Sequence, residues 1–162
     1  MEEKNNTSEL LSRAQRICSE REYCESDIRN KIQSWGGDDD NVADAIIASL
    51  KKDGFIDEMR YAGAFARDRF KYQQWGKVKI ASQMKLKHIP ASLITAGLET
   101  IDEDEYRNVL MDILSRHKKN IKAKNRFDLK GKLLRHALAK GFESHLVYEM
   151  VNEIAGEDGS DQ

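Results

Sequence analysis

The chain has 162 residues, of which 34% are charged and 40% hydrophobic, with ten glycines and one proline. This length fits one domain or a few very small ones, and so few turn-forming residues argue against an all-β fold. No apolar run approaches the roughly 18 residues that a membrane-spanning helix needs. The first residues show no secretory signal. We therefore expect a cytoplasmic all-α protein with no membrane partner.

The spacing of apolar residues predicts nine successive helices. Their expected starts and apolar stripes cover residues 8–18, 26–35, 42–50, 58–70, 77–87, 90–101, 103–114, 129–138 and 146–154. Short polar residues cap helix starts because their side chains accept hydrogen bonds from free backbone N–H groups. Such residues precede four of the predicted helices: Thr7 or Ser8, Asp39 with Asp40, Asp57, and Asp102. Glycines at 36–37, 54 and 141 are expected to end the second, third and eighth helices.

The helical pattern repeats along the chain. Ile28, Ile80 and Leu133 begin equivalent apolar stripes, at offsets of 52 and 53 residues. A fixed period of this length indicates stacked structural repeats. We expect three tandem three-helix repeats forming an elongated, curved rod. Their predicted bounds are 8–56, 57–101 and 102–155, followed by a disordered acidic tail at 156–162.

No catalytic or metal-binding pattern is present in the sequence. Gly76 and Lys77 lack the remaining residues of a phosphate-binding loop, and no HExxH pair occurs. Cys18 and Cys24 are six residues apart, unlike a zinc site, so we expect free thiols. Trp35 and Trp75 are expected to anchor the core, with base stacking as the alternative. The sequence thus predicts a protein without enzymatic activity, cofactor, metal or small-molecule substrate.

The charge is strongly patterned although the net charge is only −1. Residues 59–98 carry eight Lys or Arg against one acid, and residues 116–140 carry ten against one. The candidate binding residues are the cations Arg60, Arg67, Arg69, Lys71, Lys77, Lys79, Lys85, Lys87, Lys118, Lys119, Lys122, Lys124, Arg126, Lys130, Lys132 and Arg135. Such blocks suit phosphate contacts or an acidic protein groove. The alternative is solvated helix faces that pair with neighbouring acidic blocks.

One motif covers the start of the second predicted repeat. The run GFIDEMRYAGAFARDRF at residues 54–70 resembles the signature of the RecX family of recombination regulators. The next run, WGKVKIASQMKLKHI at residues 75–89, is similar to the continuation of that signature. His88 stands where the family usually has glycine. Within the motif we expect structural roles for Gly54, Asp57, Tyr61, Phe65, Gly76 and Ile80.

The resemblance covers residues 10–154 and implies both a fold and a function. It implies three tandem three-helix repeats and no enzymatic activity. It further implies binding to the filament of the RecA recombinase on DNA, which limits filament growth, ATP hydrolysis, strand exchange and co-protease activity. Some members of the family also touch DNA. We expect such a regulator of DNA repair, recombination and the SOS response to act as a monomer.

A rival hypothesis is a stand-alone nucleic-acid-binding helical module, because three-helix units resemble helix-turn-helix domains. Its recognition helix would lie within residues 125–140. The polar face there is mostly lysine, which favours phosphate contacts over base reading.

Overall fold

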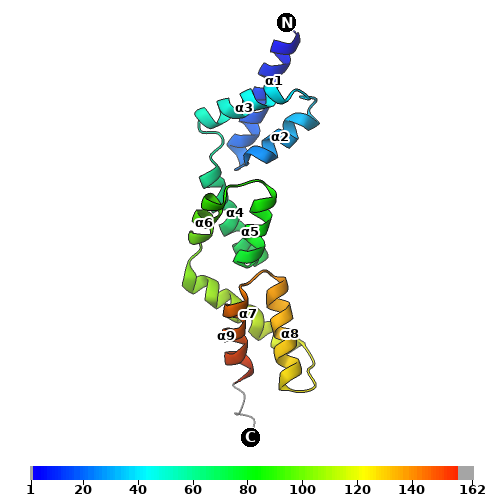
Figure 1. Cartoon of the computed structure of the whole chain (residues 1–162), viewed down its shortest axis with the longest axis vertical. Helices are drawn as coiled ribbons and strands as arrows, with labels where there is room; N and C mark the ends of the chain where they lie inside the picture. The colour runs from blue at the N-terminus through cyan, green and yellow to red at the C-terminus, as the bar shows by residue number, and fades with distance from the viewer. Residues whose placement is uncertain (1, 157–162) are drawn as a thin grey trace. The chain divides into compact units, whose positions relative to one another are not determined.

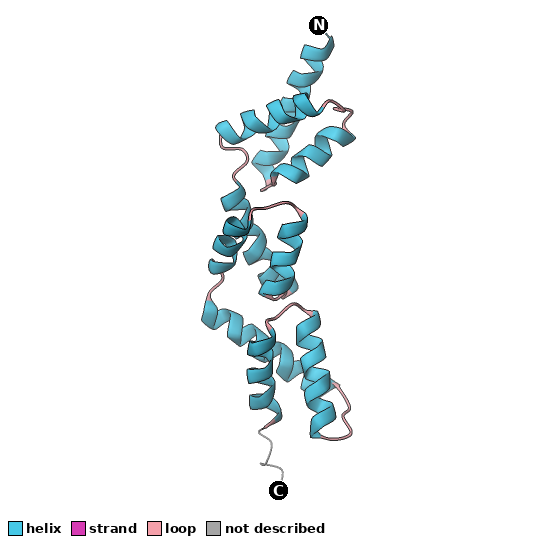
Figure 2. Cartoon of the chain, in the orientation of Figure 1, coloured by secondary structure: helices cyan, strands magenta, loops and turns pink. Residues whose placement is uncertain are grey.

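The computed structural model describes residues 2–156, with side chains described from Asn6 onward, and contains nine helices and no strand in that range (Figures 1 and 2). The helices are α1 Glu2–Glu20, α2 Glu25–Ser34, α3 Asp40–Lys52, α4 Glu58–Gln73, α5 Lys77–Leu86, α6 Ala91–Glu99, α7 Glu103–Asn120, α8 Arg126–Ala139 and α9 Ser144–Ala155. The predicted all-α class is confirmed. The tail expected at 156–162 lies, after Gly156, outside the described residues.

The chain divides into two compact units. The first unit comprises residues 2–65 and 84–97, and the second comprises residues 66–83 and 98–156. In the first unit, α1, α2 and α3 pack together around a core of Leu10, Ala14, Ile28, Ile32, Ala43, Ile46, Ile47, Leu50 and Ile56. In the second unit, α7, α8 and α9 pack on one another (Figure 1). A row of aromatic rings, Phe70, Tyr106 and Phe142, lies in this second core.

Three predicted helix caps are confirmed. Asp39 accepts a hydrogen bond from Asn41 N at 2.9 Å, and Asp102 accepts one from Glu105 N at 2.9 Å. Asp57 accepts one from Arg60 N at 3.0 Å. The start expected for the first helix is wrong, because α1 begins at Glu2 and passes through residues 7 and 8. Glutamates favour the first turn of a helix, so the helix extends into this segment.

The eighth helix begins ahead of its predicted apolar stripe, whose first residue is Leu129. Helix α8 begins at Arg126, where the Asn125 side chain accepts a hydrogen bond from Asp128 N at 2.8 Å. The first turn of α8 contains charged residues and the exposed Phe127. Because none of these residues continues the buried apolar stripe, the spacing of apolar residues does not predict this turn as helical. The capping residue was therefore the better signal.

In the described chain, six helices are followed by a residue with positive φ, including Gln74 after α4 (54°) and Gly156 after α9 (83°). Gly36, Gly54 and Gly141 follow α2, α3 and α8 with φ of 94°, 78° and 94°. His88 follows α5 with φ of 62°. After His88, Ile89 N donates to Met84 O at 3.2 Å, which closes the helix end in the manner of a Schellman motif.

Candidate partner-binding surface

Arg60 of the signature makes contacts inside the first unit. Its Nε donates to Glu22 Oε1 at 2.5 Å, and its Nη2 donates to the Gly54 carbonyl at 3.0 Å. Because Gly54 ends α3 and Asp57 caps α4, the arginine ties the turn between these helices to Glu22. These signature residues therefore set the geometry of the turn.

Lys87 is also held inside the first unit. Its Nζ lies 2.7 Å from Asp27 Oδ1 and within 6 Å of the ring centres of Tyr61 (5.7 Å) and Phe65 (5.9 Å). Burial opposes the charged ammonium, but hydrogen bonds to Asp27 and Tyr61 outweigh it and raise the pKa of Lys87. The Lys87 carbonyl accepts a bond from Ser26 Oγ at 3.0 Å. This lysine joins the end of α5 to α2.

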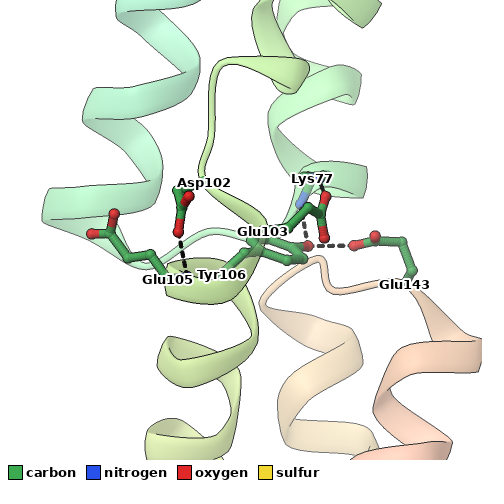
Figure 3. A network of polar contacts seen from close by, with 6 residues as sticks. All are labelled: Lys77, Asp102, Glu103, Glu105, Tyr106 and Glu143. Atoms are coloured by element: carbon green, nitrogen blue, oxygen red, sulfur yellow. Dashed lines mark hydrogen bonds and ion pairs between the residues drawn. The ribbon is translucent and has the colours of Figure 1, made fainter.

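Lys77 and Tyr106 form the polar centre of the second unit (Figure 3). The Tyr106 hydroxyl accepts a hydrogen bond from Lys77 N at 2.9 Å and donates one to Glu143 Oε1. The Lys77 ammonium pairs with Glu103 and lies 4.7 Å from the centre of the Tyr106 ring. Burial, followed by the bond to Glu143, raises the pKa of Tyr106. The hydroxyl therefore stays protonated and links α5, α7 and the start of α9.

Gly76 and Gly141 bring two turns of the second unit into backbone contact. Gly76 N donates to Lys140 O at 2.8 Å, and Val78 N donates to Gly141 O at 2.9 Å. A Cβ on Gly76 would lie 2.3 Å from the Gly141 carbonyl, which is closer than any side chain can approach. The structural role predicted for Gly76 is thus a close backbone approach.

The remaining predicted cations differ in their surroundings. Lys118 Nζ donates to the Ile154 carbonyl at 2.9 Å, and Lys132 Nζ lies 3.2 Å from Asp128. The Trp75 ring lies beside the cations of Arg69 (5.7 Å from the ring centre) and Lys79 (4.6 Å). Arg126 and Lys130 are half-buried on α8. Exposed residues are Arg67, Lys71, Lys85, Lys119, Lys122, Lys124 and Arg135.

The predicted basic residues therefore do not form one continuous set. Arg60, Lys77 and Lys87 are paired with acids of their own unit. For these three residues the structure agrees with the alternative hypothesis, in which the basic helix faces pair with neighbouring acidic segments. Among the described residues, Arg67, Lys85, Lys119, Lys122 and Arg135 form no ion pair. These residues, with the exposed Lys71 and Lys124, are the candidates for contact with a partner.

Two features of the second unit do not follow from the predicted pattern. The rings of His117 and His136 stack with centres 3.8 Å apart and planes at 5°. Burial lowers the pKa of His136, and the neighbouring His117 and Lys140 lower it further. The side chain of Phe127 is 87% exposed at the start of α8. The position of Phe127 within the basic block was a usable signal, whereas the pairing of two distant histidines was not.

Neither a metal centre nor a membrane span is found in the part of the chain that the structure describes. No group of three or more His, Cys, Asp or Glu side chains there could hold a metal ion. No helix there is long and apolar enough to cross a membrane. Cys18 and Cys24 are free thiols, and burial raises the pKa of both.

Comparison with known proteins adds evidence of ancestry. A family model described as "RecX, second three-helix domain" matches residues 57–98. Proteins named "Regulatory protein RecX" are similar over most of the chain. That of Clostridium beijerinckii is 26% identical over 98% of this chain and 74% of its own length. That of Yersinia enterocolitica is 26% identical over 91% and 98%, and that of Clostridium botulinum Alaska E43 is 32% identical over 80% and 60%.

Solved structures share the fold. The crystal structure of RecX from Lactobacillus salivarius superposes with a TM-score of 0.79 over 93% of this chain and 97% of its own, at 16% identity. A second structure of a regulatory protein RecX gives 0.78 over 91% and 72%, at 22% identity. These likenesses agree with the predicted architecture of three three-helix repeats. The signature residues, the family model and the relatives agree, and the chain belongs to the RecX family of regulatory proteins, which are not enzymes.

Proposed function

We propose that this chain binds the filament of the RecA recombinase on DNA and inhibits its extension. ATP hydrolysis, strand exchange and co-protease activity of RecA fall as a consequence, so the chain modulates DNA repair and recombination. The observation that carries this proposal is the RecX signature set in a chain that is similar to RecX proteins over most of its length. The chain acts as a monomer and needs no cofactor.

The exposed cations are the contacts we assign to the filament. Arg60, Lys77 and Lys87 hold the fold together through ion pairs, so their substitution would disturb the units themselves. Arg67 and Lys71 are exposed and one turn apart on α4, where both side chains reach the same side of the helix. Many modest contacts of this kind add up to useful affinity on a repetitive partner.

The test is single-strand-dependent ATP hydrolysis by the cognate RecA, titrated with this protein at fixed salt. We expect inhibition well below one protein per RecA subunit. The double variant Arg67→Glu/Lys71→Glu should need several-fold more protein for the same inhibition. The matched control is Arg16→Glu/Lys52→Glu, which changes the charge equally at exposed positions of the first unit.

Absence of inhibition at excess protein, with RecA loaded normally, would overturn the proposal. Equal loss in the two double variants would leave inhibition standing but remove its assignment to Arg67 and Lys71. Tight binding to naked DNA without any effect on RecA would favour the rival module.

A further inference from the structure

Phe127 is the most exposed of the large apolar side chains that remain outside the core. It lies in the first turn of α8 with 87% of its surface exposed. Lys130 follows it by three residues on the same helix and is therefore its neighbour on the helix surface, and Lys124 belongs to the loop directly before α8. We use "the Phe127 surface" for Lys122, Lys124, Phe127 and Lys130. An aromatic ring framed by cations differs from a scattered exposed apolar residue, which needs no explanation.

The segment that carries this surface is held by its own hydrogen bonds. Asp128 Oδ2 accepts a bond from Lys124 N at 3.0 Å and lies 3.2 Å from Lys132 Nζ. Lys132 Nζ also donates to the Lys122 carbonyl at 2.5 Å. The loop before α8 is therefore fixed to the helix, and Phe127 is held outward without packing of its own.

The same contacts use up the negative charge of the segment. Asp128 is the only acid among residues 116–140, which carry ten Lys or Arg. Its carboxylate is bound to Lys132 and the loop backbone. Lys119, Lys122 and Arg135 are exposed and meet no acid within the described chain. A strongly positive field thus surrounds the exposed ring.

We propose that the Phe127 surface binds an unpaired strand of nucleic acid, with one base stacked on the Phe127 ring and the adjacent phosphates on the lysines. Aromatic side chains stack on any unpaired base, and lysines bind phosphates without reading sequence. A paired duplex offers the ring no free base face, so the surface favours single strands. The lysines alone could bind an acidic protein partner, so such a partner does not explain why the Phe127 ring is exposed. This contact needs no recombinase and goes beyond the proposed function.

The experiment measures fluorescence anisotropy of a labelled oligothymidine of about 20 nucleotides and of a duplex of the same length, from about 50 to 200 mM salt. The wild-type chain should prefer the single strand. Phe127→Ala should lose about tenfold in affinity, because stacking contributes on the order of 1–3 kcal/mol per base and 1.4 kcal/mol is a factor of ten. Phe127→Leu should lose as much, while Phe127→Trp should retain binding.

Matched variants separate stacking from general effects. Tyr148→Ala removes an exposed aromatic ring from α9, 54% exposed and outside the surface, and should bind as the wild type does. Lys122→Glu should flatten the dependence of log affinity on log salt by about 0.7 or more. Because Phe127 is exposed, circular dichroism should show unchanged helix content in its variants.

Unchanged binding of Phe127→Ala, full binding of Phe127→Leu, or preference for the duplex would overturn the proposal. So would variants that bind the strand normally but no longer inhibit RecA, since the surface would then serve an acidic protein. Loss of strand binding in Phe127→Ala supports the proposal even where the wild-type chain fails to inhibit RecA. That last combination would overturn only the proposed function.

Discussion

His88 occupies a positive-φ position that glycine takes at other helix ends, Gly36, Gly54 and Gly141 among them. Its φ is 62°, compared with 78° at Gly54 and 94° at Gly36 and Gly141. The left-handed region costs a side-chain-bearing residue roughly 1–2 kcal/mol, although histidine tolerates it better than most. The family resemblance also places glycine here. His88 is exposed, so its side chain contributes little packing.

His88→Gly should therefore stabilise the chain. We expect a gain of about 0.5–1 kcal/mol, since the relief of strain exceeds the extra entropy of glycine in the unfolded chain. Urea unfolding measures this as a higher midpoint with an unchanged slope. The reciprocal control is Gly54→Ala, where no atom lies within 4 Å of the new Cβ and the whole loss comes from the backbone. A lower midpoint for His88→Gly would mean that the imidazole stabilises the turn.

Single residues differ in how far sequence reveals their role. The caps at Asp57 and Asp102 were predictable because a capping bond joins residues three apart. The partner of Arg60 was not, because Glu22 lies 38 residues away and any of several acids could have met it. The motif thus identified Arg60 as a residue with a role, and only the folded structure showed that this role is to hold the turn between α3 and α4.

At the scale of elements, the Tyr106 hydroxyl joins α5, α7 and the start of α9. Tyr106→Phe keeps the ring between Phe70 and Phe142 but leaves Lys77 N without its acceptor. An unpaired buried donor costs about 1–3 kcal/mol, so we expect a loss of that size in urea unfolding. Tyr72→Phe, at a tyrosine that is 72% exposed, should change stability by less than about 0.5 kcal/mol. Equal stability of both variants would show that the network carries no net energy.

The stacked histidines make the packing of α7 and α8 sensitive to acid. The pKa of His136 is lowered from 6.5, so the folded chain binds this proton less readily than the unfolded chain. The contribution of neutral His136 to the free energy of unfolding is fully present above about pH 6.5. It is lost progressively as the pH drops below that value. The midpoint of thermal unfolding should therefore fall between about pH 7.5 and about pH 5.5.

His136→Gln should reduce that fall in the midpoint. His145→Gln is the matched control, a histidine that is exposed on α9 and away from the stacked pair. An identical pH dependence in His136→Gln and the wild type would assign the acid sensitivity to other groups.

The apolar faces of the helices could be predicted from the sequence better than the residues at which the helices begin. The apolar stripes of α3 and α9 are regular, and their residues are buried as their spacing predicts. The start of α2 was harder to foresee, because Cys24 occupies the N-cap position and Asp27 reaches back to its N–H at 3.3 Å. The contact of Gly76 with Gly141 joins two turns 65 residues apart, which no local pattern reports.

At the scale of the molecule, the charge blocks divide into those that are used and those that are free. Residues 1–58 carry 14 Asp or Glu against eight Lys or Arg, and residues 99–115 carry six against one. Arg60 and Lys87 pair with Glu22 and Asp27 of the first of these acidic blocks, and Lys77 pairs with Glu103 of the second. The block at 116–140 has one acid for ten cations. Net charge is therefore a poor guide to what this chain attracts, because the local field follows the unpaired cations.

Retention on heparin, a polyanion, tests this reasoning. The wild-type chain should bind at low salt despite its net charge of −1. Replacing Lys119, Lys122 and Lys124 by Gln should abolish most of the retention. Replacing Arg29, Lys51 and Arg107 by Gln removes the same charge from cations that are paired with Asp44, Glu25 and Glu149, and retention should persist. Equal elution of the two triple variants would mean that total charge, and not its placement at residues 116–140, governs binding to polyanions.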